Sequence, residues 1–215
     1  MDIRNLIASR AARLLSDGDF VNLGIGIPSL CANYVPEGVR LLYHSENGIV
    51  GMGSRPDEAH RDKYIVDAGS DPASIVPGGW SCDILWSFTL MRGGHLDKSI
   101  IGALQADRHG NFASWEIPGK RTYGMGGAMD LAVGVKTLIL AMEHCQKDGT
   151  PKIVEQCSFP LTAAGCAKYI VTELCTFRIE EEQLVLMELA PGVSVETVLA
   201  KTGTPVVIPA SFEHT

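Results

Sequence analysis

The pattern of apolar and polar residues at the start of the chain predicts a helix followed by a buried strand. Apolar residues recur near helical spacing over 3–17, and Gly18 follows them where a helix commonly ends, so we predict a helix across that range. The apolar run 20–23 predicts a strand. The glycine-containing loop 24–28 then leads into a short helix that Ser29 is expected to cap.

Short apolar runs separated by glycine and proline continue along the chain and predict further strands. The run 41–44 predicts a strand that ends directly at Ser45-Glu46-Asn47-Gly48, and four more predicted strands follow at 100–104, 137–142, 153–154 and 169–172. Alternation of this kind predicts an α/β sheet. We find no interdomain linker, so we expect one domain over 1–215.

The last part of the chain predicts a hairpin and a helix. The runs 175–179 and 184–189 flank the acidic turn 180–182, which is typical of two antiparallel strands. Ser194 is expected to cap a final helix over 195–202, which Gly203 ends.

Composition and charge argue against nucleic acid and membranes as partners. Hydrophobic residues make up 46% and charged residues 20% of the 215 residues, which fits a folded globular chain. The net charge is −7 and the basic residues are scattered, so we expect neither nucleic acid nor an anionic membrane as a partner. No apolar run approaches the roughly 18 residues of a membrane span. The N-terminus lacks the features of a signal peptide, so we expect a soluble, cytoplasmic protein.

Cysteines and histidines give no metal-binding pattern. The six cysteines include no CxxC pair, so we expect buried thiols without metal or disulfide. The six histidines are isolated from one another, and we expect hydrogen-bonded structural roles for all of them at 44, 60, 95, 109, 144 and 214.

Familiar nucleotide and hydrolase motifs are incomplete. Gly24-Ile25-Gly26 follows a predicted strand, but Ser29 stands where a dinucleotide fingerprint needs its third glycine. A tight turn explains the loop equally well, although such a turn also lets main-chain amides approach an anion. Lys120 has no P-loop around it, and Pro56 interrupts a possible nucleophile elbow, so neither ATP chemistry nor a serine hydrolase is indicated.

Two glycine-bracketed segments remain as candidates for chemistry. In 44–53, Glu46 stands at the carboxyl end of a strand, where open α/β sheets bind ligands, although a surface glutamate in a turn explains it as well. In 118–130, the glycines at 124, 126 and 127 let successive N–H groups point at one spot, as an anion site requires. A flexible or tightly packed loop is the alternative.

Together these segments resemble family I CoA-transferases. Ser45-Glu46-Asn47-Gly48 resembles their glutamate motif, and 124–130 resembles their GMGGAMD loop. The segments 22–28, 92–97, 100–105 and 160–162 are also similar, in the family's order, so that the resemblance covers essentially the whole chain. It implies a beta subunit of the 3-oxoacid, acetoacetate or butyrate CoA-transferase type. The implied fold is an open mixed α/β sheet with flanking helices, the CoA-transferase (NagB/RpiA-like) fold shared with sugar-phosphate isomerases.

The resemblance also implies roles for particular residues. Glu46 matches the nucleophile that forms a glutamyl-CoA thioester, and Gly127 matches the glycine whose amide stabilises the oxyanion. A side chain at 127 is expected to disturb a backbone conformation open mainly to glycine. Substrate contacts are expected from Gly24, Gly26, Asn47, Gly48 and Gly126. No cofactor or metal is needed, because the CoA thioester is itself a substrate.

The implied partners are an alpha subunit, in a complex of two alpha and two beta chains, together with an acyl-CoA and a carboxylic acid. Two alternatives remain on the same scaffold. One is an acyl-CoA thioester hydrolase, in which water captures the glutamyl intermediate. The other is a non-catalytic binding or regulatory relative, against which the intact Glu46 motif argues.

Overall fold

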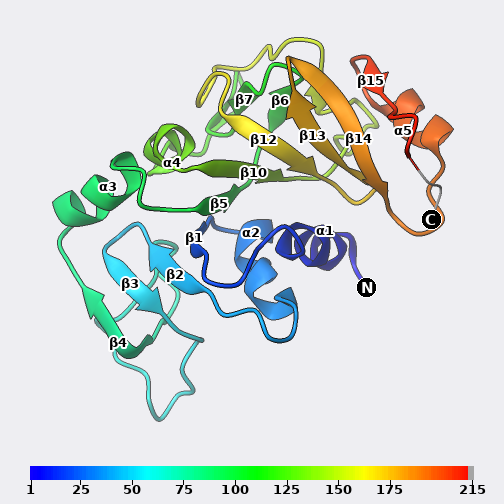
Figure 1. Cartoon of the computed structure of the whole chain (residues 1–215). Coiled ribbons are helices and arrows are strands. Elements are labelled where there is room, and N and C mark those ends of the chain that lie inside the picture. Colours follow the sequence, from blue (N-terminus) through cyan, green and yellow to red (C-terminus); the bar gives the residue numbers. More distant parts are fainter. Residues whose placement is uncertain (213–215) are drawn as a thin grey trace.

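The computed structural model describes residues 1–212 and arranges them around a ten-stranded sheet (Figure 1). The helices are α1 (Ile3–Ala12), α2 (Ile27–Leu30), the 3-10 helix η1 (Cys31–Tyr34), α3 (Ile84–Arg92), α4 (Ala128–Gly134) and α5 (Val195–Lys201). The first strands are β1 (Phe20–Leu23), β2 (Leu42–Ser45), β3 (Ile49–Met52), β4 (Ile75–Ser81), β5 (Lys98–Ile101), β6 (Gln105–Asp107) and β7 (Phe112–Ala113). They are followed by β8 (Glu116–Ile117), β9 (Arg121–Thr122), β10 (Thr137–Ala141), β11 (Ile153–Val154), β12 (Ala167–Val171), β13 (Cys175–Glu180), β14 (Gln183–Leu189) and β15 (Val206–Val207).

The large sheet has a parallel centre with antiparallel pairs toward both edges. Its strand order is β15-β14-β13-β12-β10-β5-β1-β2-β3-β4, and β12, β10, β5, β1 and β2 run parallel to one another. From β1 the chain continues to β2 on one side, whereas from β5 it continues toward β10 on the other. The order therefore reverses between β1 and β5, and open α/β sheets bind ligands outside the carboxyl ends of strands at such a point.

Successive side chains of the central strands pack alternately into two hydrophobic cores, one on each face of the sheet. Ile100 and Ile139 point toward α1 and belong to a cluster with Ile7 and Val21. Their neighbours in sequence, such as Ile101 and Leu140, belong to the larger cluster with Met91 of α3 and Leu131 of α4. Figure 1 shows α1 and α2 on one face and α4 with β6 and β7 on the other. The mixed α/β sheet predicted from the sequence is confirmed.

The predictions for the N-terminal elements need two corrections. Helix α1 begins after Asp2, whose carboxylate caps the helix by accepting a hydrogen bond from the Asn5 main-chain N–H. The helix ends at Ala12 rather than at 17, and turns lead from there to Gly18. Ser29 does not cap α2, because the helix starts at Ile27 with Gly26 as its N-cap. The Ser29 hydroxyl instead donates to the Gly26 carbonyl at 2.9 Å.

The elements predicted for the later part of the chain match the structure where the local sequence pattern agrees with the strand pairing. The predicted hairpin is confirmed as β13 and β14, and its turn places Glu181 and Glu182 at positive φ. The Ser194 cap is confirmed, since its hydroxyl accepts from the Thr197 amide. The strand expected over 100–104 is instead β5, which ends at Ile101 before the link to β6. Helices α3 and α4 and strands β3 and β4 had no counterpart in the prediction.

The cysteines and histidines follow the prediction in part. Cys31 and Cys175 are buried free thiols, whereas the other four cysteines are partly exposed. His44 and His144 are buried and hydrogen-bonded, as predicted, and His214 lies outside the described residues. Among residues 1–212, the longest apolar helical stretch falls short of what a membrane crossing requires.

Candidate active site

Glu46 stands in a tight turn that joins β2 to β3. The Gly48 amide closes the turn on the Ser45 carbonyl at 2.9 Å, and Cys82 donates its amide to the Gly48 carbonyl at 2.8 Å. Gly48 has a φ of +119°, and a Cβ there would overlap the Cys82 carbonyl, so the position requires glycine. Because β2 ends at Ser45 and the turn requires Gly48, the main chain of Glu46 is held at the edge of the sheet.

The glycine-rich loop before α4 meets the Glu46 carboxylate. The main-chain N–H of Gly127 donates to Oε1 of Glu46 at 3.1 Å, and an ideal Cβ on Gly126 would lie 3.5 Å from the same oxygen. Gly124 and Gly126 have positive φ values of 91° and 54°, which turn the loop toward the carboxylate. The two glycine-bracketed segments predicted from the sequence are therefore brought into direct contact.

The conformational expectation for Gly127 was wrong. Its φ is −84°, which any residue can adopt. The space around it is what excludes a side chain, because a Cβ would lie 2.9 Å from the Glu46 carboxyl carbon.

A cavity of about 540 Å³ opens over Glu46 and Gly127 at the reversal point of the sheet. Its walls are the ends of β1 and β5, the Glu46 turn and the glycine-rich loop. The lining segments are 22–25, 45–46, 101–104 and 123–128, together with Ala68, Ser114 and Leu131. Half-buried Glu46 is the carboxylate in this lining. The cavity thus lies where the topology alone predicts a ligand.

The predicted site residues divide between this cavity and its supports. Glu46, Gly24, Gly126 and Gly127 line the cavity, whereas Gly26, Asn47 and Gly48 lie outside its lining. The side-chain amide Nδ2 of Asn47 donates to the Val66 carbonyl at 2.8 Å and so connects the Glu46 turn to the loop that contains Val66. The Gly24 main-chain N–H donates to the Ile100 carbonyl at 2.8 Å, so this amide is hydrogen-bonded within the protein and does not point at the cavity.

Sequence reasoning missed a buried chain of polar groups behind Glu46. The Ser87 hydroxyl of α3 donates to the Glu46 carbonyl at 2.7 Å, and Nε2 of His44 lies 2.9 Å from the same hydroxyl. Asn22 Nδ2 lies 3.2 Å from His44 Nδ1. Burial lowers the pKa of His44 to about 4, which keeps its ring neutral near pH 7. His44 lies in the segment 44–53 and Asn22 in the segment 22–28, whereas Ser87 lies in no segment that the sequence singled out.

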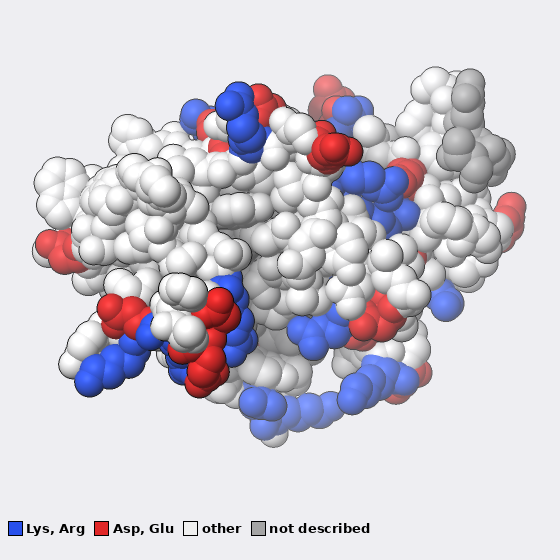
Figure 2. Space-filling view, turned by 90° about the horizontal axis from the view of Figure 1, so that it is seen from below, with Lys and Arg blue, Asp and Glu red and all other residues white. Residues whose placement is uncertain are grey.

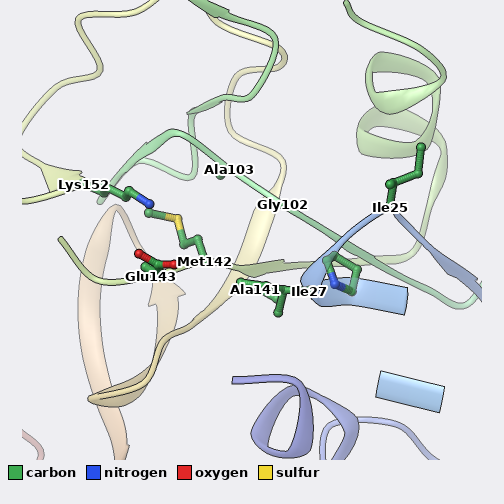
Figure 3. A pocket seen from close by; sticks show the side chains of 9 residues that line it. Ile25, Ile27, Gly102, Ala103, Ala141, Met142, Glu143 and Lys152 are labelled. Atoms are coloured by element: carbon green, nitrogen blue, oxygen red, sulfur yellow. The ribbon is translucent and has the colours of Figure 1, made fainter. Parts of the chain in front are cut away.

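A second, smaller cavity of about 190 Å³ adjoins the first and shares Ile25, Gly102 and Ala103 with it. Figure 3 shows Lys152 and Glu143 at one end of this cavity and Ile25 at the other. The sequence analysis did not single out these two charged residues. Among the described residues, no group of three His, Cys, Asp or Glu side chains is placed to hold a metal ion.

The fold and the site define the class of protein: an open α/β enzyme whose candidate nucleophile is a carboxylate aimed at a main-chain N–H in a crevice. The family model described as coenzyme A transferase matches residues 4–201. The chain belongs to the coenzyme A transferase family, and the resemblance seen in the sequence is confirmed.

Two relatives and one structure show how the chain fits this family. It is 48% identical over 202 residues to acetate CoA-transferase subunit beta of Escherichia coli K12, covering 94% of this chain and 92% of the relative. It is 42% identical to human mitochondrial succinyl-CoA:3-ketoacid coenzyme A transferase 2, covering 94% of this chain but 40% of that protein. The crystal structure of an acyl-CoA transferase apoenzyme from Escherichia coli O157:H7 matches the fold with a TM-score of 0.74 at 22% identity, covering 97% of this chain and 42% of that one.

Proposed function

We propose that this chain is the beta subunit of a CoA-transferase that moves CoA from an acyl-CoA to a short 3-oxo or fatty acid through a glutamyl-CoA thioester on Glu46. The observation that carries the proposal is the 3.1 Å hydrogen bond from the Gly127 amide to Glu46 Oε1 inside the cavity. A carboxylate that lines a cavity and is held in place by a main-chain hydrogen bond is suited to attack the carbonyl of a bound substrate.

The reaction proceeds in two matched halves. Glu46 attacks the acyl-CoA carbonyl, the carbon–sulfur bond breaks, and a mixed anhydride and CoA thiolate form. The thiolate then attacks the Glu46 carbonyl and expels the first acid as its carboxylate, leaving glutamyl-CoA. A second carboxylate reverses both steps, so turnover is ping-pong and needs no cofactor.

The Gly127 amide is assigned to the oxyanion that forms on Glu46 itself. When the thiolate attacks the Glu46 carbonyl, negative charge develops on the glutamyl oxygen, and Oε1 already accepts the amide hydrogen bond. Loss of one such donor typically raises the barrier of acyl transfer by about 3 to 4 kcal/mol. The structure favours this oxygen over the carbonyl oxygen of the incoming acyl-CoA, since the amide points at Glu46.

We propose an alpha subunit as the partner, in a complex of two alpha and two beta chains in the cytoplasm. The human relative is a single chain in which this sequence matches 40% of the length, which leaves room for a second half. Helices α3 and α4 expose large apolar side chains, with Leu85 76%, Trp86 62% and Val133 68% exposed. In Figure 2 the upper left of the visible face is mostly free of charge, whereas charged side chains gather at the lower left. An apolar surface beside the open site fits a subunit that closes it against water.

An acceptor-dependence assay separates transfer from hydrolysis. The complex is incubated with acetyl-CoA or succinyl-CoA, with and without butyrate or acetoacetate, and both free CoA and the new acyl-CoA are quantified. Transfer predicts that new acyl-CoA appears only with the acceptor and that little free CoA accumulates without it. Rapid release of CoA in the absence of acceptor would instead support the thioester hydrolase.

A further inference from the structure

Helix α3 contacts both halves of the candidate active site. Its buried Ser87 donates to the main-chain carbonyl of Glu46 at 2.7 Å. Its last turn packs against α4, the helix that follows Gly127, since a Cβ on Gly134 would overlap the carbonyl of Met91. Arg92 of α3 also forms an ion pair with Asp130 of α4. The nucleophile and the amide that faces it are thus both attached to one helix.

The hydrogen bonds behind Ser87 have a single consistent direction. The Asn22 amide nitrogen can only donate, so Nδ1 of His44 accepts and the ring proton is on Nε2. Nε2–H then donates to the Ser87 oxygen, and the Ser87 hydroxyl is left to donate to the Glu46 carbonyl. All three side chains are at most 1% exposed, so water does not compete for these groups.

We propose that Ser87, supported by His44 and Asn22, is a positioning residue that fixes the main chain of Glu46 relative to the Gly127 amide. Without the Ser87 hydroxyl, the Glu46 carbonyl loses its anchor on α3 and the turn is free to shift. The carboxylate then leaves the 3.1 Å contact with the amide that the chemistry uses. Misplacement by about 1 Å lowers rates by up to about 100-fold in enzymes. The inference rests on the proposed function of Glu46.

The chain offers a matched control for this role. Ser99 on β5 is as buried as Ser87, but its hydroxyl has no hydrogen-bond partner among the described residues. Ser87→Ala and Ser99→Ala therefore remove the same atom from equally buried sites, and only the first breaks the contact with Glu46. Both variants are prepared as the complex with the alpha subunit, and their unfolding temperatures, kcat and KM are compared with the parent.

We expect Ser87→Ala to lower kcat by roughly 10-fold to 100-fold with KM for acyl-CoA within about twofold, because alignment and not binding is lost. Ser99→Ala should retain the parental kcat. Equal kcat values for the two variants overturn the proposal, as does a loss confined to KM. Failure of the parent itself to form glutamyl-CoA would instead count against the proposed function.

A second pair of variants tests the direction of the chain and covers the case in which Ser87→Ala fails to fold. His44→Gln keeps a neutral N–H donor near the position of Nε2, whereas His44→Leu keeps bulk without a donor. We expect His44→Leu to lose at least about tenfold in kcat and His44→Gln to recover most of it. The same kcat for both variants overturns the proposal.

Discussion

Gly127 and Glu46 are separated by 81 residues in the chain, yet the amide of one donates to the carboxylate of the other at 3.1 Å. The Glu46 turn is held by Gly48 and Cys82, and the Gly127 loop is held by α4. Their meeting at the carboxyl side of β1 and β5 is a consequence of sheet topology.

A methyl group at Gly127 should block the reaction without unfolding the protein. The backbone at φ −84° accepts alanine, but its Cβ would press on the Glu46 carboxyl carbon. We expect Gly127→Ala, and more strongly Gly127→Val, to lower kcat by about 100-fold or more with a smaller effect on acyl-CoA binding. Steady-state kinetics of the assembled enzyme measure this. A parental kcat in Gly127→Val would place the oxyanion donor elsewhere.

Shortening the nucleophile should be nearly as harmful as removing it. Glu46→Asp withdraws the carboxylate from the Gly127 amide by the length of one methylene, whereas Glu46→Ala removes it. We expect Glu46→Ala to abolish transfer and Glu46→Asp to lose at least about 100-fold in kcat, with unfolding temperatures close to the parent. Turnover near the parental rate in either variant contradicts the assignment of the nucleophile.

The apolar side chains on α3 and α4 should be needed for assembly. We expect Leu85→Glu combined with Val133→Glu to weaken binding of the alpha subunit at least tenfold, as measured by sedimentation or calorimetry. Leu199→Glu on α5, where the parent side chain is 42% exposed, is the matched control. The isolated chain should be nearly inactive. Unchanged alpha binding in the double variant would show that another surface joins the subunits.

Acid should destabilise the folded chain through two buried histidines. Burial lowers the pKa of His44 and of His144 from 6.5 to about 4, and Lys201 adds to the effect at His144. Between these values the unfolded chain binds more protons than the folded one, so stability falls as pH decreases from about 6.5 to about 4. Each histidine contributes up to about 3 kcal/mol to this loss. Urea unfolding from pH 7.5 to 4.5 measures it, and His144→Gln should flatten the slope. A free energy of unfolding that stays constant over this range would contradict the account.

The sequence predicted the site better than the elements around it. The motifs at 45–48 and 124–130 pointed to Glu46 and Gly127 through their resemblance to the family, because the residues alone left a surface glutamate and a packed loop as alternatives. Both motifs contain a position that requires glycine, Gly48 because Cys82 approaches closely and Gly126 because of its positive φ. Helix α3 was missed because its first turn exposes Ile84, Leu85 and Trp86 and so gives no clear amphipathic pattern. The contact of Ser87 with Glu46 spans 41 residues and depends on tertiary packing, which no local pattern encodes.

The most direct test of the central claim is mass spectrometry of the chain in complex with its alpha subunit after brief exposure to acyl-CoA without an acceptor acid. The account predicts that a peptide containing Glu46 gains the mass of CoA less one water. The adduct should disappear when an acceptor carboxylate is added and should be absent in Glu46→Ala. If an active complex carries CoA on a different residue, or carries none while the acyl group is transferred, the glutamyl-CoA mechanism is wrong.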